Sequence, residues 1–109
     1  MIPDGPASPG SLPSLRGFQR QIEALYADRD RARGVDGTFV WFVEEVGELA
    51  RAVKRRDPEN LKVEFSDALA WLATLASLLG VDLAEAASRY LSGCPRCASS
   101  PCACPPRRT

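Results

Sequence analysis

The chain has 109 residues, a length that allows one domain at most. It has 14 basic and 14 acidic residues, so its net charge is zero. Zero net charge argues against a general nucleic-acid binder, and no apolar run reaches the roughly 18 residues of a membrane span. The N-terminus has no basic segment followed by an apolar one. We therefore expect no secretory signal, a cytoplasmic location, and neither a membrane nor a nucleic acid as partner.

Residues 1–14 are rich in Pro, Gly and Ser, which predicts a disordered tail. A first helix is predicted from Leu15 to about Asp30, because its apolar residues recur at helical spacing. This apolar side consists of Phe18, Ile22, Leu25 and Tyr26. The glycines at 34 and 37 predict a break after it.

A second helix is predicted from about Thr38 to Arg56. Asp57 and Pro58 favour a new helix start, with Asp as the N-cap and Pro at the first helical position. The third helix is expected over 59–79, ending at Gly80, since glycine is common just past a helix C-terminus.

Asp82 and Glu85 resemble a capping box and predict a short fourth helix to about Leu91. No segment shows the pattern of a strand. We therefore predict an all-α fold, a four-helix bundle over 15–91 with short connections, completed by oligomerisation. Composition changes at Ser92, so 92–109 is expected to form a separate cysteine-rich tail.

Two acidic pairs interrupt the apolar faces of the second and third predicted helices. Glu45 with Glu48, and Glu64 with Asp67, are three residues apart, so each pair lies on one side of its helix. On a helical wheel Glu64 points where a core residue would, between Trp71 and Leu75. The chain has no histidine, the commonest general base, so carboxylates are the leading candidates for chemistry.

Burying unpaired charge is costly, and the usual compensation is a cation. Four carboxylates suit a hard cation, Mg²⁺ or Mn²⁺. The simpler alternative is a solvated helix face with ion pairs to Arg51, Arg55 and Lys62, which the apolar surroundings of the acids disfavour.

The segments FVWFVEEVGELARAV and DPENLKVEFSDALAWLATLA carry Glu-Glu-x-x-Glu, then 15 residues, then Glu-x-x-Asp. This ordered pair resembles the signature of MazG-like nucleoside triphosphate pyrophosphohydrolases, of the all-α NTP pyrophosphatase superfamily, over residues 15–91. The resemblance implies an enzyme that cleaves an NTP between the α and β phosphates, giving NMP and pyrophosphate. A role in clearing unwanted nucleotides, and a homodimer or homotetramer, are implied in the same way.

Carried over by position, the resemblance makes Glu45, Glu48, Glu64 and Asp67 ligands of Mg²⁺. Glu44 would lie close by, as a second-metal ligand or an aid in orienting water; a plain surface acid is the alternative. Such a site activates water without a histidine.

The basic residues that hold the phosphates are not evident. The family often uses a C-terminal helix, where this chain has only Arg89. Lys54, Arg55, Arg56 and Lys62 are candidates for these phosphate contacts. Arg51 and Lys54 to Arg56 are also candidates for a positive rim that attracts triphosphate, with a solvated helix end as the alternative. Trp41 is a candidate for stacking on a base, with a core position as the alternative; Trp71 is expected in the core.

The tail reads Cys94-Pro-Arg-Cys97 and then Cys102-Ala-Cys104. Four thiolates in eleven residues suit a structural Zn²⁺ site, and disulfides or free thiols are the alternatives. The competing function for the whole chain is a non-catalytic helical interaction module that uses this tail to bind a partner.

Overall fold

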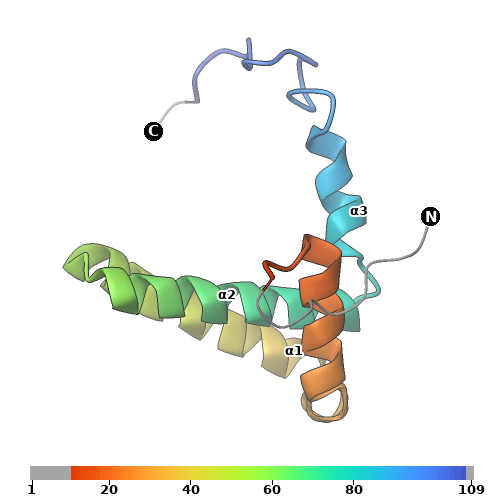
Figure 1. The fold of residues 1–109 in the computed structure, drawn as a ribbon, viewed down its shortest axis with the longest axis vertical. Coiled ribbons are helices and arrows are strands. Elements are labelled where there is room, and N and C mark those ends of the chain that lie inside the picture. Colours follow the sequence, from red (N-terminus) through yellow and green to blue (C-terminus); the bar gives the residue numbers. More distant parts are fainter. Residues whose placement is uncertain (1–10, 108–109) are drawn as a thin grey trace.

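The computed structural model describes residues 11–107, which form helices and turns and contain no strand (Figure 1). The α-helices are α1 (Leu15–Arg55), α2 (Pro58–Leu78) and α3 (Leu83–Ala87), and the 3₁₀-helix η1 (Ser88–Tyr90) follows α3 directly. The predicted all-α class is confirmed. The structure differs from the predicted four helices in one respect: the first two predicted helices form a single bent helix, α1. The expected disorder of 1–14 falls largely outside the described residues.

The bend in α1 lies at Gly34, the one residue in the helix with non-helical backbone angles (φ 83°, ψ 175°). This region of backbone space is essentially restricted to glycine. Gly37, which was expected to be part of the break, is helical. The halves of α1 consequently run in different directions, and the C-terminal half lies alongside α2 (Figure 1).

The turn between α1 and α2 forms as its sequence predicts. Arg56 adopts the left-handed conformation at the end of α1, and its N–H donates to the carbonyl of Ala52. The Asp57 side chain then accepts from the N–H of Glu59, with Pro58 at the first position of α2. This tight reversal sets the C-terminal half of α1 against the start of α2.

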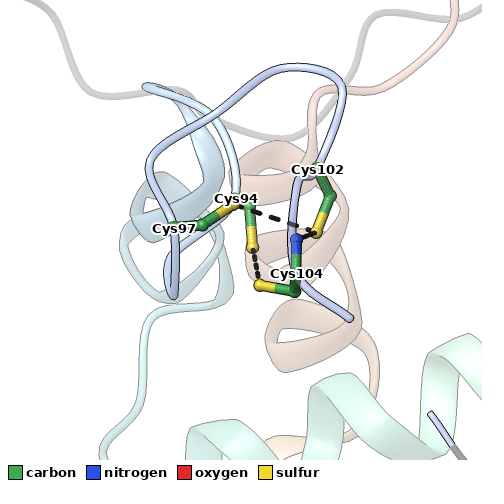
Figure 2. Close-up of side chains that lie close together, drawn as sticks. All are labelled: Cys94, Cys97, Cys102 and Cys104. Carbon is green, nitrogen blue, oxygen red and sulfur yellow. Dashed lines mark hydrogen bonds between the residues drawn. The ribbon is translucent and has the colours of Figure 1, made fainter. Parts of the chain in front are cut away.

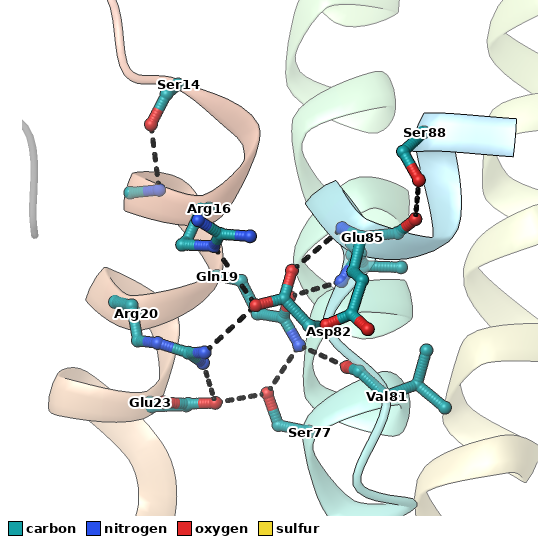
Figure 3. A network of polar contacts seen from close by, with 12 residues as sticks. Ser14, Arg16, Gln19, Arg20, Glu23, Ser77, Val81, Asp82, Glu85 and Ser88 are labelled. Carbon is teal, nitrogen blue, oxygen red and sulfur yellow. Dashed lines mark hydrogen bonds and ion pairs between the residues drawn. The ribbon is translucent and has the colours of Figure 1, made fainter. Parts of the chain in front are cut away.

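A polar network fixes α3 against the N-terminal half of α1 (Figure 3). The buried Gln19 amide donates to Ser77 Oγ (3.0 Å) and the Val81 carbonyl (2.8 Å), and accepts from the Leu83 N–H (2.8 Å). Asp82 caps α3 by accepting from the Glu85 N–H, as predicted. Its other oxygen accepts from two arginines of α1, Arg16 (3.1 Å) and Arg20 (3.2 Å).

The hydrophobic core of the single chain is small. Among the described residues, the buried apolar side chains are Ile22, Ala52, Ala73 and Ala76. The radius of gyration is 16.2 Å, against about 13 Å for a compact domain of this length. Large apolar side chains lie exposed on both long helices, among them Phe39, Val40, Val43, Val63, Phe65 and Leu72. One chain thus leaves much apolar surface uncovered.

Among the described residues, no single helix is long and apolar enough to cross a membrane. The bent pair Pro58–Leu78 and Leu83–Tyr90 passes that test only when the two helices are taken together, across an angle of 104°.

Candidate metal and nucleotide site

Three of the four predicted metal ligands meet between α1 and α2. Glu45 lies in the C-terminal half of α1, and Glu64 and Asp67 lie one turn apart on α2. One carboxylate oxygen from each residue lies within 4.8 Å of those of the other two. The helical wheel placed both acidic pairs towards the contact between these helices, and the structure brings the three side chains together there.

The environment of these carboxylates is costly for negative charge. Glu45 Oε2 and Glu64 Oε2 are buried and have no hydrogen-bond partner among the described residues. Burial raises the pKa of Glu45 above its ordinary value, and the neighbouring carboxylates of Asp67, Glu64 and Glu48 raise it further. A buried acceptor without a donor costs about 1–3 kcal/mol, and more when it is charged.

The other two acids predicted for the site, Glu48 and Glu44, lie outside the group of three. Glu48 is close enough to raise the pKa of Glu45, but its carboxylate accepts from Arg51 on the same helix and is not in the three-residue group. Glu44 is exposed. The structure therefore separates a central trio from two acids that lie beside it.

Two tryptophans lie beside the acids. Trp41 and Trp71 stack with their ring centroids 6.0 Å apart and their planes at 17°. Trp41 is about half exposed and Trp71 is partly exposed, so the expectation of a core position for Trp71 is wrong. The Arg33 guanidinium covers the Trp71 ring, 4.7 Å from its centroid. Arg33 and Trp41 thus both pack on the Trp71 ring, and Trp41 is the more exposed of the two tryptophans.

A pocket of about 310 Å³ opens next to the acids, and its wall includes Asp67, Trp71, Arg29 and Arg33. Arg33 donates to Asp30 Oδ1 and Thr38 Oγ1, both at 3.1 Å, so its position is fixed across the Gly34 bend. The exposed Arg29 makes no ion pair with any described residue. The pocket wall thus combines an arginine that has no ion pair among the described residues, an aromatic ring, a carboxylate of the trio, and the buried Asp30 paired with Arg33.

The two arginines of the pocket, Arg29 and Arg33, are not among the residues that the sequence predicted for phosphate contacts. Lys54, Arg55, Arg56 and Lys62 were considered for phosphate contacts, but they are exposed and do not line this pocket. The sequence does contain a feature that could have identified the two pocket arginines. Arg29 and Arg33 are four residues apart, so on a helix they share one face, and they come just before the predicted break at Gly34.

The acidic trio fits a divalent metal ion. Three carboxylates converge, and two of their buried oxygens have no hydrogen-bond partner within residues 11–107. Hard cations take such oxygen ligands, and Mg²⁺ is usually held by only a few carboxylates, with water and substrate phosphates completing its shell. The donor set therefore matches Mg²⁺ or Mn²⁺ better than a softer metal.

The four cysteines form a second cluster, at the C-terminal end of the described chain (Figure 2). None of these four cysteines forms a disulfide bond, and their sulfur atoms lie within 4.8 Å of one another. The sequence placed Cys94, Cys97, Cys102 and Cys104 in one site, and the structure brings them together.

The fold and the acidic trio define a class of all-α proteins with carboxylates converging from paired helices. A comparison with family models matches residues 34–96 to the MazG nucleotide pyrophosphohydrolase domain. This match covers more than half of the chain, which therefore belongs to the MazG nucleotide pyrophosphohydrolase family. No curated protein matches the chain. Arg29, Arg33 and three of the four cysteines fall outside the matched residues.

Proposed function

We propose that this protein is a Mg²⁺- or Mn²⁺-dependent nucleoside triphosphate pyrophosphohydrolase that cleaves between the α and β phosphates, giving NMP and pyrophosphate. The observation that carries the proposal is the trio of Glu45, Glu64 and Asp67, with two buried oxygens that have no hydrogen-bond partner in the described part of the chain. Family membership supports the reaction class. A role in removing unwanted nucleotides follows from the same resemblance.

The trio holds the metal in this proposal, with Glu48 and Glu44 close by as further ligands or as partners of water. A bound divalent ion supplies neutralisation of charge on the phosphate oxygens and lowers the pKa of a bound water. The two helices supply the positions of the carboxylates, so the site needs no loop closure to assemble.

The pocket beside the trio indicates where the phosphates and the base of the nucleotide would bind. Arg29 is exposed and unpaired among the described residues, so it is the cation best placed to bind a phosphate group. Asp67 belongs to both the trio and the pocket wall, which brings the phosphates within reach of the metal site. Trp41, which is about half exposed and stacks on Trp71, offers an aromatic surface for a base.

We further propose a homodimer or homotetramer. The core is small, and exposed apolar side chains line α1 and α2, including Val40, Val43 and Phe65. Exposed apolar patches of this kind mark association surfaces. A second copy of the chain offers the same apolar helices in return, and a two-fold interface buries one patch against the other.

The test is pyrophosphate release from a panel of ordinary and damaged NTPs, with Mg²⁺ or Mn²⁺, and with EDTA as the control. Metal-dependent release of pyrophosphate with an equal amount of NMP is the expected result. Release of inorganic phosphate and NDP would contradict the proposed bond. No release from folded, metal-loaded protein would favour a non-catalytic interaction module.

A further inference from the structure

The geometry of the cysteine cluster matches a tetrahedral metal site. The Sγ atoms of Cys94 and Cys104 are 3.8 Å apart, and those of Cys97 and Cys102 are 3.9 Å apart (Figure 2). Zinc–thiolate bonds are about 2.3 Å long, so the edge of a regular ZnS₄ tetrahedron is about 3.8 Å. The two non-overlapping sulfur pairs thus have the spacing of two opposite edges of such a tetrahedron.

Backbone N–H groups favour the thiolate form at two of the four cysteines. The Ala103 N–H donates to Cys97 Sγ and the Cys104 N–H donates to Cys102 Sγ, both at 3.3 Å. Such N–H groups stabilise the anionic form of the sulfur that a metal requires.

The first half of the cluster is built as a tight loop. The Cys94 carbonyl accepts from the Ala98 N–H (2.7 Å), and the Cys94 N–H donates to the Ser99 carbonyl (3.0 Å). Gly93 allows this closure, because it has φ 111° and a Cβ there would lie 2.9 Å from the Ala98 carbonyl oxygen. The loop thus places Cys94 and Cys97 side by side before any ligand is considered.

Little else holds this segment in place. Within residues 92–107 no residue is buried and no helix forms. Chain ordering costs roughly 1–2 kcal/mol per residue for the backbone alone, and apolar burial does not offset that cost here. Small elements of this kind are held by disulfides or by a metal ion.

Three arginines lie beside the cluster, along one pocket. A pocket of about 620 Å³ is bordered by three of the cysteines and by Arg89, Arg96 and Arg107. Four thiolates around a divalent ion carry a net charge of minus two, which these guanidinium groups offset. The same pocket is bordered by Tyr90, so the cluster lies against the end of η1.

We propose that Cys94, Cys97, Cys102 and Cys104 bind one Zn²⁺ ion, and that this ion folds the segment 93–107 against η1. Four thiolate ligands leave no open position, so the site is structural and takes no part in nucleotide cleavage. Nothing in this proposal depends on the proposed enzymatic activity.

The experiment is elemental analysis of the full chain, purified without added metal, followed by Co²⁺ titration of the metal-free protein under reducing conditions. We expect one zinc per chain. With Co²⁺ we expect the intense visible absorption of a tetrahedral site and a thiolate-to-metal charge-transfer band. In Cys102→Ser both the zinc and the charge-transfer band should be lost, with helical content unchanged because the segment contains no helix.

Two control variants separate the possible origins of the metal signal. Ser92→Ala, in the same exposed stretch, should keep the full zinc content. Glu64→Gln should also keep it, because the carboxylate trio is a different site. Zinc retained in Cys102→Ser, or no zinc in the wild-type chain, would overturn the proposal. Two disulfides in protein alkylated at the moment of lysis would overturn it as well.

Discussion

Glu45 of α1 and Glu64 of α2 each hold a buried Oε2 atom that has no hydrogen-bond partner among the described residues, and their carboxylates lie within 4.8 Å of each other. Two such carboxylates close together destabilise the fold unless a cation or a shared proton offsets their charge. The closeness of the Glu45 and Glu64 carboxylates is therefore better explained by cation binding than by a contribution to fold stability. Asp67, one turn after Glu64, completes the group of three.

Substitution of Glu64 by Gln should remove pyrophosphate release while the protein stays folded. The loss should exceed the roughly 10- to 100-fold change that follows loss of an outer partner of a metal ligand. Glu59→Gln, which makes the same charge change at an exposed position of the same helix, is the matched control and should leave kcat/KM nearly unchanged. Equal activities of Glu64→Gln and Glu59→Gln would show that Glu64 is not a ligand in the active site.

The same variant should have the opposite effect on stability when no metal is present. Glu64→Gln removes one of the clustered charges and adds a donor beside the raised-pKa carboxyl of Glu45. The free energy of unfolding in EDTA should rise by about 1 kcal/mol. Addition of Mg²⁺ should stabilise the wild-type chain and not the variant. Denaturant unfolding with and without Mg²⁺ measures both effects, and a less stable variant in EDTA would contradict this account.

The acidic site was largely predictable because its information is local. Helical periodicity alone places Glu45 and Glu64 on apolar faces, and Asp57-Pro58 fixes the reversal that brings the two helices together. Arg29 was not predictable in the same way. Its place in the pocket depends on the angle that Gly34 gives to the two halves of α1, and this angle is set by tertiary contacts such as that between Asp30 and Thr74 (3.2 Å).

Arg29→Gln should weaken nucleotide binding more than it slows chemistry. Loss of a charge-assisted contact to phosphate costs about 1.5–3 kcal/mol, which corresponds to a roughly 10- to 100-fold rise in KM. The matched control is Arg31→Gln, since Arg31 pairs with Asp28 and does not line the pocket beside the trio. Steady-state kinetics with one NTP decides the matter. An unchanged KM in Arg29→Gln would mean that the phosphates lie elsewhere.

Two glycines of α1 should respond in opposite directions to alanine. Gly34→Ala should destabilise the fold by about 1–3 kcal/mol, because φ 83° with ψ 175° is strained for any residue with a Cβ. Gly47→Ala, within the helix, should stabilise by about 0.5–1 kcal/mol. At both positions a Cβ meets nothing within 4 Å, so backbone conformation alone separates them. Equal unfolding midpoints would show that the bend at Gly34 is not strained.

Asp82 should contribute a pH-dependent part of the stability. The backbone N–H of Glu85 lowers its pKa below 3.8, and Arg16 lowers it further. The stabilisation is therefore present above pH 3.8 and is lost as pH falls through the lower folded-state pKa. Asp82→Asn keeps a good N-cap but loses the charge pairing with Arg16 and Arg20, so it should be less stable than wild type near neutral pH.

The same position offers an internal comparison. Asp82→Ala loses both the cap and the charge, so it should be less stable than Asp82→Asn. The difference between wild type and Asp82→Asn should shrink in acid, as measured by urea unfolding at several pH values. A difference that stays constant down to the lowest pH would exclude the ion pairs as its cause.

The sequence did not predict which of the apolar helix residues are covered in the folded chain. Helical spacing identified Phe18, Ile22 and Leu25 as one apolar side, yet Ile22 is buried and Leu25 is 57% exposed. Periodicity shows which residues favour burial, but it does not say whether the same chain or another copy covers them. The position of Trp71 at the pocket was missed for the same reason.

The most direct test of the central claim is a phosphorus NMR time course of one NTP with Mg²⁺, using wild type and Glu64→Gln in parallel. Our account predicts that signals of NMP and pyrophosphate appear together in the wild-type sample and stay absent in the variant. Appearance of NDP and inorganic phosphate in the wild-type sample, or equal turnover in both, would contradict it.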